Sequence, residues 1–125
     1  MTLVDSSGWV EYFTDGALAD EFAPYLENSA EVVTPTIVIF EVYRVIRRQR
    51  SEEVATAAVA QMQKTLVVDL DQFLALTAAD VSIEHGLAMA DAIVYATARI
   101  ENVDLVTIDS DFEGLPGARV YSRPT

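Results

Sequence analysis

The sequence contains no cysteine, a single histidine and a single lysine. Without cysteine the chain has neither a disulfide framework nor a thiolate metal site, which is compatible with an intracellular location. No uninterrupted apolar run approaches the roughly 18 residues needed to span a bilayer, and the N-terminus has no charged segment followed by a long apolar stretch. We therefore expect a cytoplasmic protein without a membrane association, folded as one domain over residues 1–125.

Several familiar catalytic motifs are also missing. The chain has no G-x-x-x-x-G-K-[ST], G-x-G-x-x-G or G-x-S-x-G pattern, so phosphate loops, dinucleotide folds and nucleophile elbows have no support. The only histidine, His85, precedes Gly86 at a predicted helix end, where a capping or surface role is the simpler interpretation. The sequence therefore gives no support for a Ser-His-Asp catalytic triad.

Positive charge is scarce: 20 acidic residues face 8 basic ones, which gives a formal net charge of -12. This balance disfavours non-specific binding to polyanions and favours solubility, cation binding or a basic partner. Four of the eight basic residues nevertheless fall within seven consecutive positions, namely Arg44, Arg47, Arg48 and Arg50. Two interpretations are open for them, a solvated helix end and a functional basic patch.

Short runs of strand-forming residues alternate with longer helical stretches. Strands are expected at residues 2–4, 31–34, 66–68, 105–108 and 118–121. Helices are expected at residues 8–13, 17–26, 35–48, 51–64, 72–85 and 89–100. This alternation predicts an α/β fold whose central parallel sheet of four to five strands has helices on both faces. The order of the strands is not readable from the pattern.

Local signals add detail to these elements. Thr34 is expected to cap the 35–48 helix, with Pro35 in its first position, and Ser51 to cap the next helix. For the aromatic residues of the 8–13 helix we favour burial in the core over a dimer or partner surface; they are Trp9, Tyr12 and Phe13. The 72–85 helix carries apolar residues on one side, namely Phe73, Leu76, Ala79 and Ile83.

The residues best suited to carry out chemistry are carboxylates in apolar surroundings. These are Asp5 after the first strand, Glu41 and Asp91 in helices, and Asp109 and Asp111 after the 105–108 strand. A buried, unpaired carboxylate is costly, so each must be paired, protonated or bound to a metal. Taken singly, each also has an ordinary interpretation: a helix cap, a first-turn acid, a turn residue or, for Glu41, an ion pair with a nearby arginine.

In combination the acids indicate a metal site. Asp5 and Asp109 each follow a strand of a parallel sheet, so both project from the same edge, and the helices carrying Glu41 and Asp91 begin on that side. Four converging acids cannot all remain ionised without a cation. Hard oxygen ligands without His or Cys suit Mg²⁺, with Mn²⁺ as an alternative.

Four segments resemble the motifs of PIN-domain ribonucleases, in the same order and over nearly the whole chain. They are residues 1–9 (MTLVDSSGW), 36–41 with the following Val-Tyr-Arg, 86–93 (GLAMADAI) and 107–112 (TIDSDF). A compact chain of this size, without added domains, is similar to the VapC toxins of toxin-antitoxin pairs.

The resemblance implies a PIN-like three-layer α/β/α fold and a Mg²⁺-dependent endoribonuclease, with RNA as substrate, an antitoxin as partner and a homodimeric assembly. It implies a catalytic metal site formed by Asp5, Glu41, Asp91 and Asp109, with Asp111 as second choice to Asp109. Ser6 and Thr107 would be supporting hydroxyls, and Arg44 and Arg48 would contact RNA or the antitoxin. The cap of the first helix is expected to pass to Ser6 or Ser7, which would leave Asp5 free for the metal.

Three other interpretations compete with a nuclease. A haloacid-dehalogenase-like phosphatase needs a second Asp two residues after Asp5, where Ser7 stands. A response-regulator receiver needs a lysine at a late strand end, but the only one, Lys64, lies in a predicted helix. An acidic interaction module of the same fold would act by binding alone, and the presence of all four acids argues against it.

Overall fold

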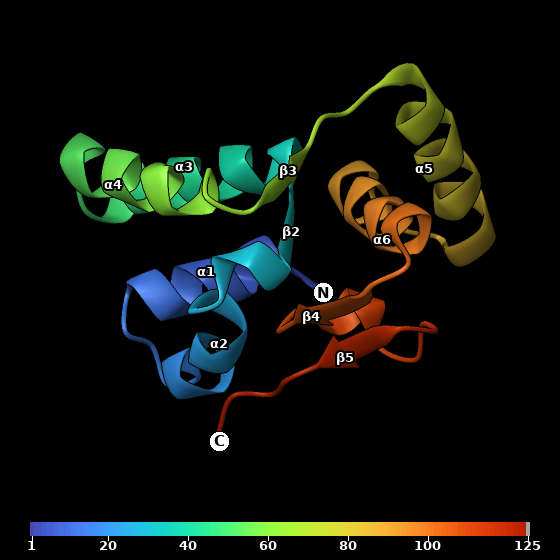
Figure 1. Cartoon of the computed structure of the whole chain (residues 1–125). Coiled ribbons are helices and arrows are strands. Elements are labelled where there is room, and N and C mark those ends of the chain that lie inside the picture. The colour runs from blue at the N-terminus through green and yellow to red at the C-terminus, as the bar shows by residue number, and fades with distance from the viewer. Residues whose placement is uncertain (125) are drawn as a thin grey trace.

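The computed structural model describes residues 1–124, which form alternating strands and helices (Figure 1). The strands are β1 (Thr2–Val4), β2 (Val32–Pro35), β3 (Leu66–Val68), β4 (Asp104–Thr107) and β5 (Ala118–Val120). The α-helices are α1 (Ser6–Phe13), α2 (Ala19–Leu26), α3 (Thr36–Gln49), α4 (Glu52–Met62), α5 (Gln72–His85) and α6 (Met89–Glu101). Two short 3₁₀ helices complete the chain, η1 (Ser29–Glu31) and η2 (Ser110–Phe112).

The five strands form one sheet in the order β3-β2-β1-β4-β5, and every neighbouring pair is parallel. β1 lies at the centre, where Leu3 is opposite Val33 on one side and Leu105 on the other. The predicted α/β fold with a parallel sheet of four to five strands is confirmed. Because the first crossovers lead from β1 to β2 and β3, and the chain then returns to β4, the strand order reverses beside β1.

Helices cover both faces of the sheet, as the predicted three-layer α/β/α arrangement requires. Crossovers between parallel strands are almost always right-handed, so connections that run in opposite directions along the sheet lie on opposite faces. In Figure 1, α1 and α2 lie on one side of β4, and α5 and α6 lie on the other. α3 and α4 form a hairpin of helices that extends beyond the edge of the sheet (Figure 1).

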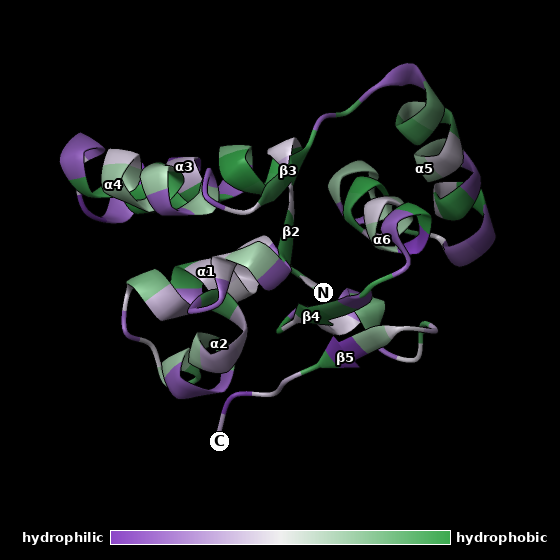
Figure 2. Ribbon diagram, in the orientation of Figure 1, coloured by the Kyte–Doolittle hydropathy of each residue, from purple (hydrophilic) through white to green (hydrophobic). Residues whose placement is uncertain are grey.

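The core is built from the central strands and the helices against them. Leu3, Val33 and Leu105 are fully buried, and α6 is buried through all residues from Ala92 to Ala98, as expected for a helix apolar over most of its surface. Figure 2 shows that β4 is hydrophobic over most of its length, in agreement with its place in the core. Trp9 is only 2% exposed, so its predicted place in the core is confirmed.

Within residues 1–124 no single helix is long and apolar enough to cross a membrane, although α5 and α6 reach that length together across a 110° bend. The seven consecutive buried residues of α6 account for its apolar composition, because they pack inside the protein. The bend between the two helices therefore belongs to the packing of the α/β fold.

The predicted cap at Thr34 is wrong, whereas the cap at Ser51 is confirmed. Thr34 lies within β2, fully buried, and its hydroxyl accepts a hydrogen bond of 2.6 Å from the Thr65 hydroxyl. The strand continues through Pro35, and α3 begins at Thr36 without a side-chain cap. Ser51 accepts a hydrogen bond of 3.1 Å from the backbone N–H of Val54.

The predicted bounds of the 72–85 helix are confirmed: α5 ends at His85, and Gly86 caps it with a left-handed φ of 69°. The side carrying Phe73, Leu76 and Ile83 nevertheless faces outward, and these residues are 67%, 62% and 85% exposed. α5 instead packs with the opposite side, which bears Leu74, Ala78 and Val81. Because α5 has apolar residues on both sides, periodicity alone does not select the buried one.

Candidate metal centre

The strand order brings two acids to one edge of the sheet. Asp5 follows β1 directly, and Asp109 lies two residues beyond the end of β4, the neighbouring parallel strand. From these two strands the chain departs in opposite directions, toward β2 and toward β5. Ligands of open α/β sheets bind at such a switch point, outside the carboxyl ends of the strands.

Asp5 is held by three donors although it is only 4% exposed. One carboxylate oxygen accepts a hydrogen bond of 2.8 Å from the backbone N–H of Ser6, and the other accepts one of 2.7 Å from the Thr107 hydroxyl. The Ser7 hydroxyl contributes a longer contact of 3.4 Å to the second oxygen. Asp5 is thus itself the N-cap of α1, and the prediction that Ser6 or Ser7 would take this role is wrong. Its extended backbone places the carboxylate over the first turn of the helix.

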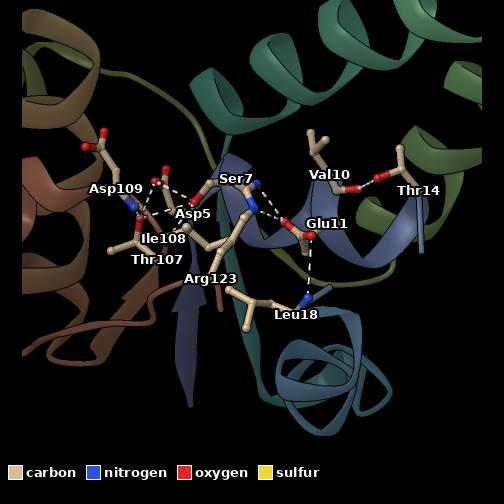
Figure 3. Close-up of polar contacts among 10 residues, drawn as sticks. All are labelled: Asp5, Ser7, Val10, Glu11, Thr14, Leu18, Thr107, Ile108, Asp109 and Arg123. Carbon is tan, nitrogen blue, oxygen red and sulfur yellow. Dashed lines mark hydrogen bonds and ion pairs between the residues drawn. The ribbon is translucent and has the colours of Figure 1, made fainter. Parts of the chain in front are cut away.

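Ser7 and Thr107 tie the beginning of α1 to the end of β4 (Figure 3). Their hydroxyl oxygens lie 3.2 Å apart, and Ser7 Oγ accepts a hydrogen bond of 3.0 Å from the backbone N–H of Ile108. Thr107 Oγ1 also accepts one of 2.9 Å from the N–H of Asp109. The resemblance to PIN-domain ribonucleases implied Thr107 and Ser6 as supporting hydroxyls and did not imply Ser7. The only signal for Ser7 is that it is a second serine directly after Asp5-Ser6.

The remaining acids come from three other segments. Glu41 lies in α3, Asp91 in the first turn of α6, and Asp111 in η2, which Asp109 caps by accepting a hydrogen bond of 2.9 Å from the N–H of Asp111. Carboxylate oxygens of Asp91, Asp109 and Asp111 lie within 4.8 Å of one another. The structure therefore brings Asp111, the second choice from the sequence, into the same cluster as Asp109.

Burial and mutual repulsion raise the pKa of three of these carboxyls. The pKa of Asp91 rises to about 7, through burial first and then through the negative charges of Asp109 and Asp5. Burial, followed by the charge of Asp5, also raises the pKa of Glu41. Burial raises the pKa of Asp5 despite the opposing hydrogen bond from Thr107. Each of the three carboxyls therefore lies within the electrostatic field of neighbouring acids.

Within the part of the chain that the structure describes, no cation pairs with these acids. Among residues 1–124, none of these five acids forms an ion pair, and the pairing considered for Glu41 with a neighbouring arginine is absent. The donor set consists of oxygen atoms alone, which is the set that Mg²⁺ and Mn²⁺ prefer. This oxygen-only cluster extends from the buried Asp5 to the exposed Asp111 and pairs with no cation among residues 1–124, so it fits a divalent cation.

The two arginines predicted to contact RNA or the antitoxin lie farther along α3. Arg44 and Arg48 follow Glu41 by three and seven residues, so they lie near the same side of the helix. Both are exposed and line a groove between α3 and α4.

Comparison with known families agrees with this architecture. The family model for the PIN domain matches residues 2–118. The chain belongs to the PIN-domain family. Among curated proteins no sequence matches it significantly. The resemblance drawn from the four sequence motifs is confirmed, and this PIN domain carries its acids at the carboxyl edge of β1 and β4.

Solved structures share the fold over nearly their full length. A toxin–antitoxin complex from Klebsiella pneumoniae aligns with a TM-score of 0.81 and 23% identity, covering 98% of this chain and 99% of that one. VapC20 from Mycobacterium tuberculosis, a toxin that cleaves the sarcin–ricin loop, aligns with a TM-score of 0.77 and 22% identity, covering 99% and 100%. DNA-bound VapBC from Salmonella typhimurium aligns with a TM-score of 0.74 and 17% identity, covering 97% of this chain and 96% of that one. At these identities the likeness establishes the shared fold of the PIN domain.

Proposed function

We propose that this PIN domain is a Mg²⁺-dependent endoribonuclease and the toxin of a VapBC-type toxin–antitoxin pair. The observation that carries the proposal is the group of Asp91, Asp109 and Asp111, whose carboxylate oxygens lie within 4.8 Å of one another and whose Asp91 is in the electrostatic field of Asp5 and Glu41. These acids lie at a switch point of the sheet, and none of them pairs with a cation among residues 1–124. Membership of the PIN-domain family and the structural likeness to VapC20 support the nuclease assignment.

The proposed chemistry is hydrolysis of an RNA phosphodiester to leave a 5′-phosphate and a 3′-hydroxyl. A divalent cation bound at such a site lowers the pKa of a bound water, orients it for in-line attack and neutralises charge on the phosphate. Asp5 and Asp91 would be direct ligands, while Glu41 and Asp109 would act partly through water. Thr107, by donating to the Asp5 carboxylate, keeps one of its oxygens at a fixed position.

An antitoxin protein and a second copy of the chain are the proposed protein partners. The likeness to toxin–antitoxin complexes supports the antitoxin. The exposed apolar side of α5, formed by Phe73, Leu76 and Ile83, supports a homodimer because an apolar surface of this kind is typical of protein interfaces. Light scattering coupled to size-exclusion chromatography measures the assembly directly.

Cleavage of RNA by the Asp5→Asn protein tests the proposed activity. We expect the substitution to lower Mg²⁺-dependent cleavage at least about a hundredfold, because it removes a charged ligand from the cluster. Asp20→Asn is the matched control, since it removes the same charge from an exposed position in α2 and should leave cleavage unchanged. Undiminished cleavage by the Asp5→Asn protein would overturn the assignment.

Calorimetric titration with Mg²⁺ and Mn²⁺ separates the nuclease from an acidic interaction module of the same fold. The nuclease hypothesis requires saturable binding that is lost in the Asp5→Asn protein and kept in the Asp20→Asn protein. A protein that acts only as a binding module would show no cation binding at the cluster.

A further inference from the structure

α3 and α4 enclose a groove of about 710 Å³ on the helix that carries Glu41. The two helices run side by side in Figure 1, and the end of their hairpin that lies farthest from the sheet is hydrophilic (Figure 2). Apolar and aromatic residues, two threonines and three arginines line the groove: Thr36, Ile39, Phe40, Tyr43, Arg44, Arg47, Arg48, Thr56 and Val59. It therefore combines aromatic surface with positive charge in a chain of net charge -12.

Phe40 is the aromatic residue of this groove nearest in sequence to the acid cluster. It directly precedes Glu41 and is 60% exposed, and its ring stacks on no other aromatic ring among residues 1–124. An exposed phenyl ring does not contribute much to core stability. It does offer a flat surface on which an unpaired base can stack.

The arginines continue from Phe40 and Glu41 along α3. Arg44 lies one helical turn beyond Phe40, and Arg48 lies about 10 Å beyond Glu41 at about 1.5 Å per residue. Within residues 1–124, Arg44 and Arg48 form no ion pair, and Arg47 has only an exposed contact of 3.7 Å with Glu52. These cations are therefore available to an anion, and an extended polyanion can contact them in succession.

We propose that the α3–α4 groove binds single-stranded RNA, with one base stacked on Phe40 and the adjoining phosphates on Arg44 and Arg48. The inference rests on the proposed nuclease function and extends it. By holding one nucleotide at a fixed distance from Glu41, the groove determines which phosphodiester reaches the acid cluster. Bases inside a duplex cannot stack on Phe40, so the groove selects unpaired RNA.

Substitutions at Phe40 test the stacking contact. Affinity for a fluorescein-labelled single-stranded RNA is measured by anisotropy in Mg²⁺, in the Asp5→Asn background so that binding is read without turnover. Phe40→Leu should weaken binding about tenfold, because it keeps apolar surface but removes the aromatic face, whereas Phe40→Trp should retain it. Ile100→Val, at an exposed apolar residue of α6 outside both the groove and the proposed dimer surface, is the control and should have no effect.

The arginine contacts have a separate readout. Arg44→Gln should lower affinity at all salt concentrations and reduce the slope of log affinity against log salt by about one. A duplex of the same sequence should bind the F40L protein as well as it binds the parent, because its paired bases make no contact with Phe40. Equal affinity of the parent and F40L for single-stranded RNA would overturn the inference.

A protein occupant of the groove gives a different result. If a second copy of the chain fills it, Arg44→Gln and F40L change the mass measured by light scattering and leave RNA affinity unchanged, which also overturns the inference. Failure of the proposed function is distinguishable, since it appears as Mg²⁺-dependent cleavage that survives Asp5→Asn. If the Asp5→Asn protein loses cleavage while the Phe40 variants bind single-stranded RNA as tightly as the parent does, only the groove assignment fails.

Discussion

Two buried carboxylates at the beginning of the chain, Asp5 and Glu11, have opposite surroundings. They are 4% and 5% exposed. Glu11, in α1, receives two hydrogen bonds from the guanidinium of Arg123, at 2.7 and 3.1 Å, and a weaker one of 3.5 Å from the N–H of Leu18 (Figure 3). Asp5 receives hydrogen bonds from neutral groups only, and its charged neighbours are acids.

The difference distinguishes an acid that the fold neutralises, Glu11, from the acid to which we assign a function, Asp5. The chain supplies a cation where a buried carboxylate serves to connect segments, as Glu11 connects α1 to the C-terminal residues. Residues 1–124 supply no cation to Asp5, although Asp5 is buried as deeply as Glu11, and Glu41, Asp91 and Asp109 add negative charge instead. A site left with this excess of negative charge is suited to a cation from outside the chain.

The contrast between Asp5 and Glu11 can be tested in several ways, and the largest expected effect is the pH dependence of Mg²⁺ affinity. The pKa of Asp91 is raised to about 7, so below that pH the carboxyl holds a proton that a metal must displace. Affinity should therefore rise with pH, by about tenfold per unit below pH 7, and level off above it. Calorimetric titrations between about pH 5 and 8 measure this slope.

Glu11→Gln is the control for that slope. It removes one buried negative charge outside the cluster, so the pH dependence of Mg²⁺ affinity should persist. A flat profile in the parent protein would mean that the proton on Asp91 does not compete with the metal.

A smaller loss of Mg²⁺ affinity is expected when the Thr107 hydroxyl is removed. Thr107→Val deletes the donor to Asp5 and the acceptor for the Asp109 N–H, and loss of such supporting contacts typically costs about 10- to 100-fold in metal affinity. Thr97→Val is the matched control, because Thr97 is equally buried but bonds only to the carbonyl of Ile93 within α6. Similar affinities for the two variants would contradict a supporting role for Thr107.

The contrast between Asp5 and Glu11 also marks what can be predicted from the sequence. Asp5 is found because a short apolar strand ends directly before it, and this signal is local. The strand order that sets β4 beside β1 depends on crossovers, so no local pattern reveals it. The contacts of Ser7 and Thr107 depend on side-chain geometry between residues about 100 positions apart.

The same limit applies to α5 and to Glu11. The bounds of α5 follow from its periodic apolar residues and the glycine after it. Which of its two apolar sides is buried depends on α6, through contacts that no local pattern specifies. Glu11 gives no signal at all, because its partner Arg123 lies at the other end of the chain.

The smallest expected effect concerns the stability of the protein without metal. Substitution of Glu11 should lower this stability, and substitution of Asp5 should raise it. Glu11→Gln removes a charge-assisted pair whose arginine is partly exposed, so it should lower the free energy of unfolding by about 1–2 kcal/mol. Asp5 has a raised pKa in the folded protein, so its ionised form opposes folding, and the loss of stability grows as pH rises toward that pKa. Asp5→Asn should therefore raise the melting temperature at neutral pH in a metal chelator.

Saturating Mg²⁺ should reverse the order of the parent and the Asp5→Asn protein, because the parent retains the full acid cluster and a cation that binds only the folded state stabilises it. Thermal melts of the parent, Asp5→Asn and Glu11→Gln proteins, each in chelator and in Mg²⁺, measure both effects. Glu11→Gln should lose the same stability in the two conditions, since Arg123 and not a metal neutralises Glu11. Destabilisation by both substitutions in chelator would show that Asp5, like Glu11, serves the fold rather than a metal.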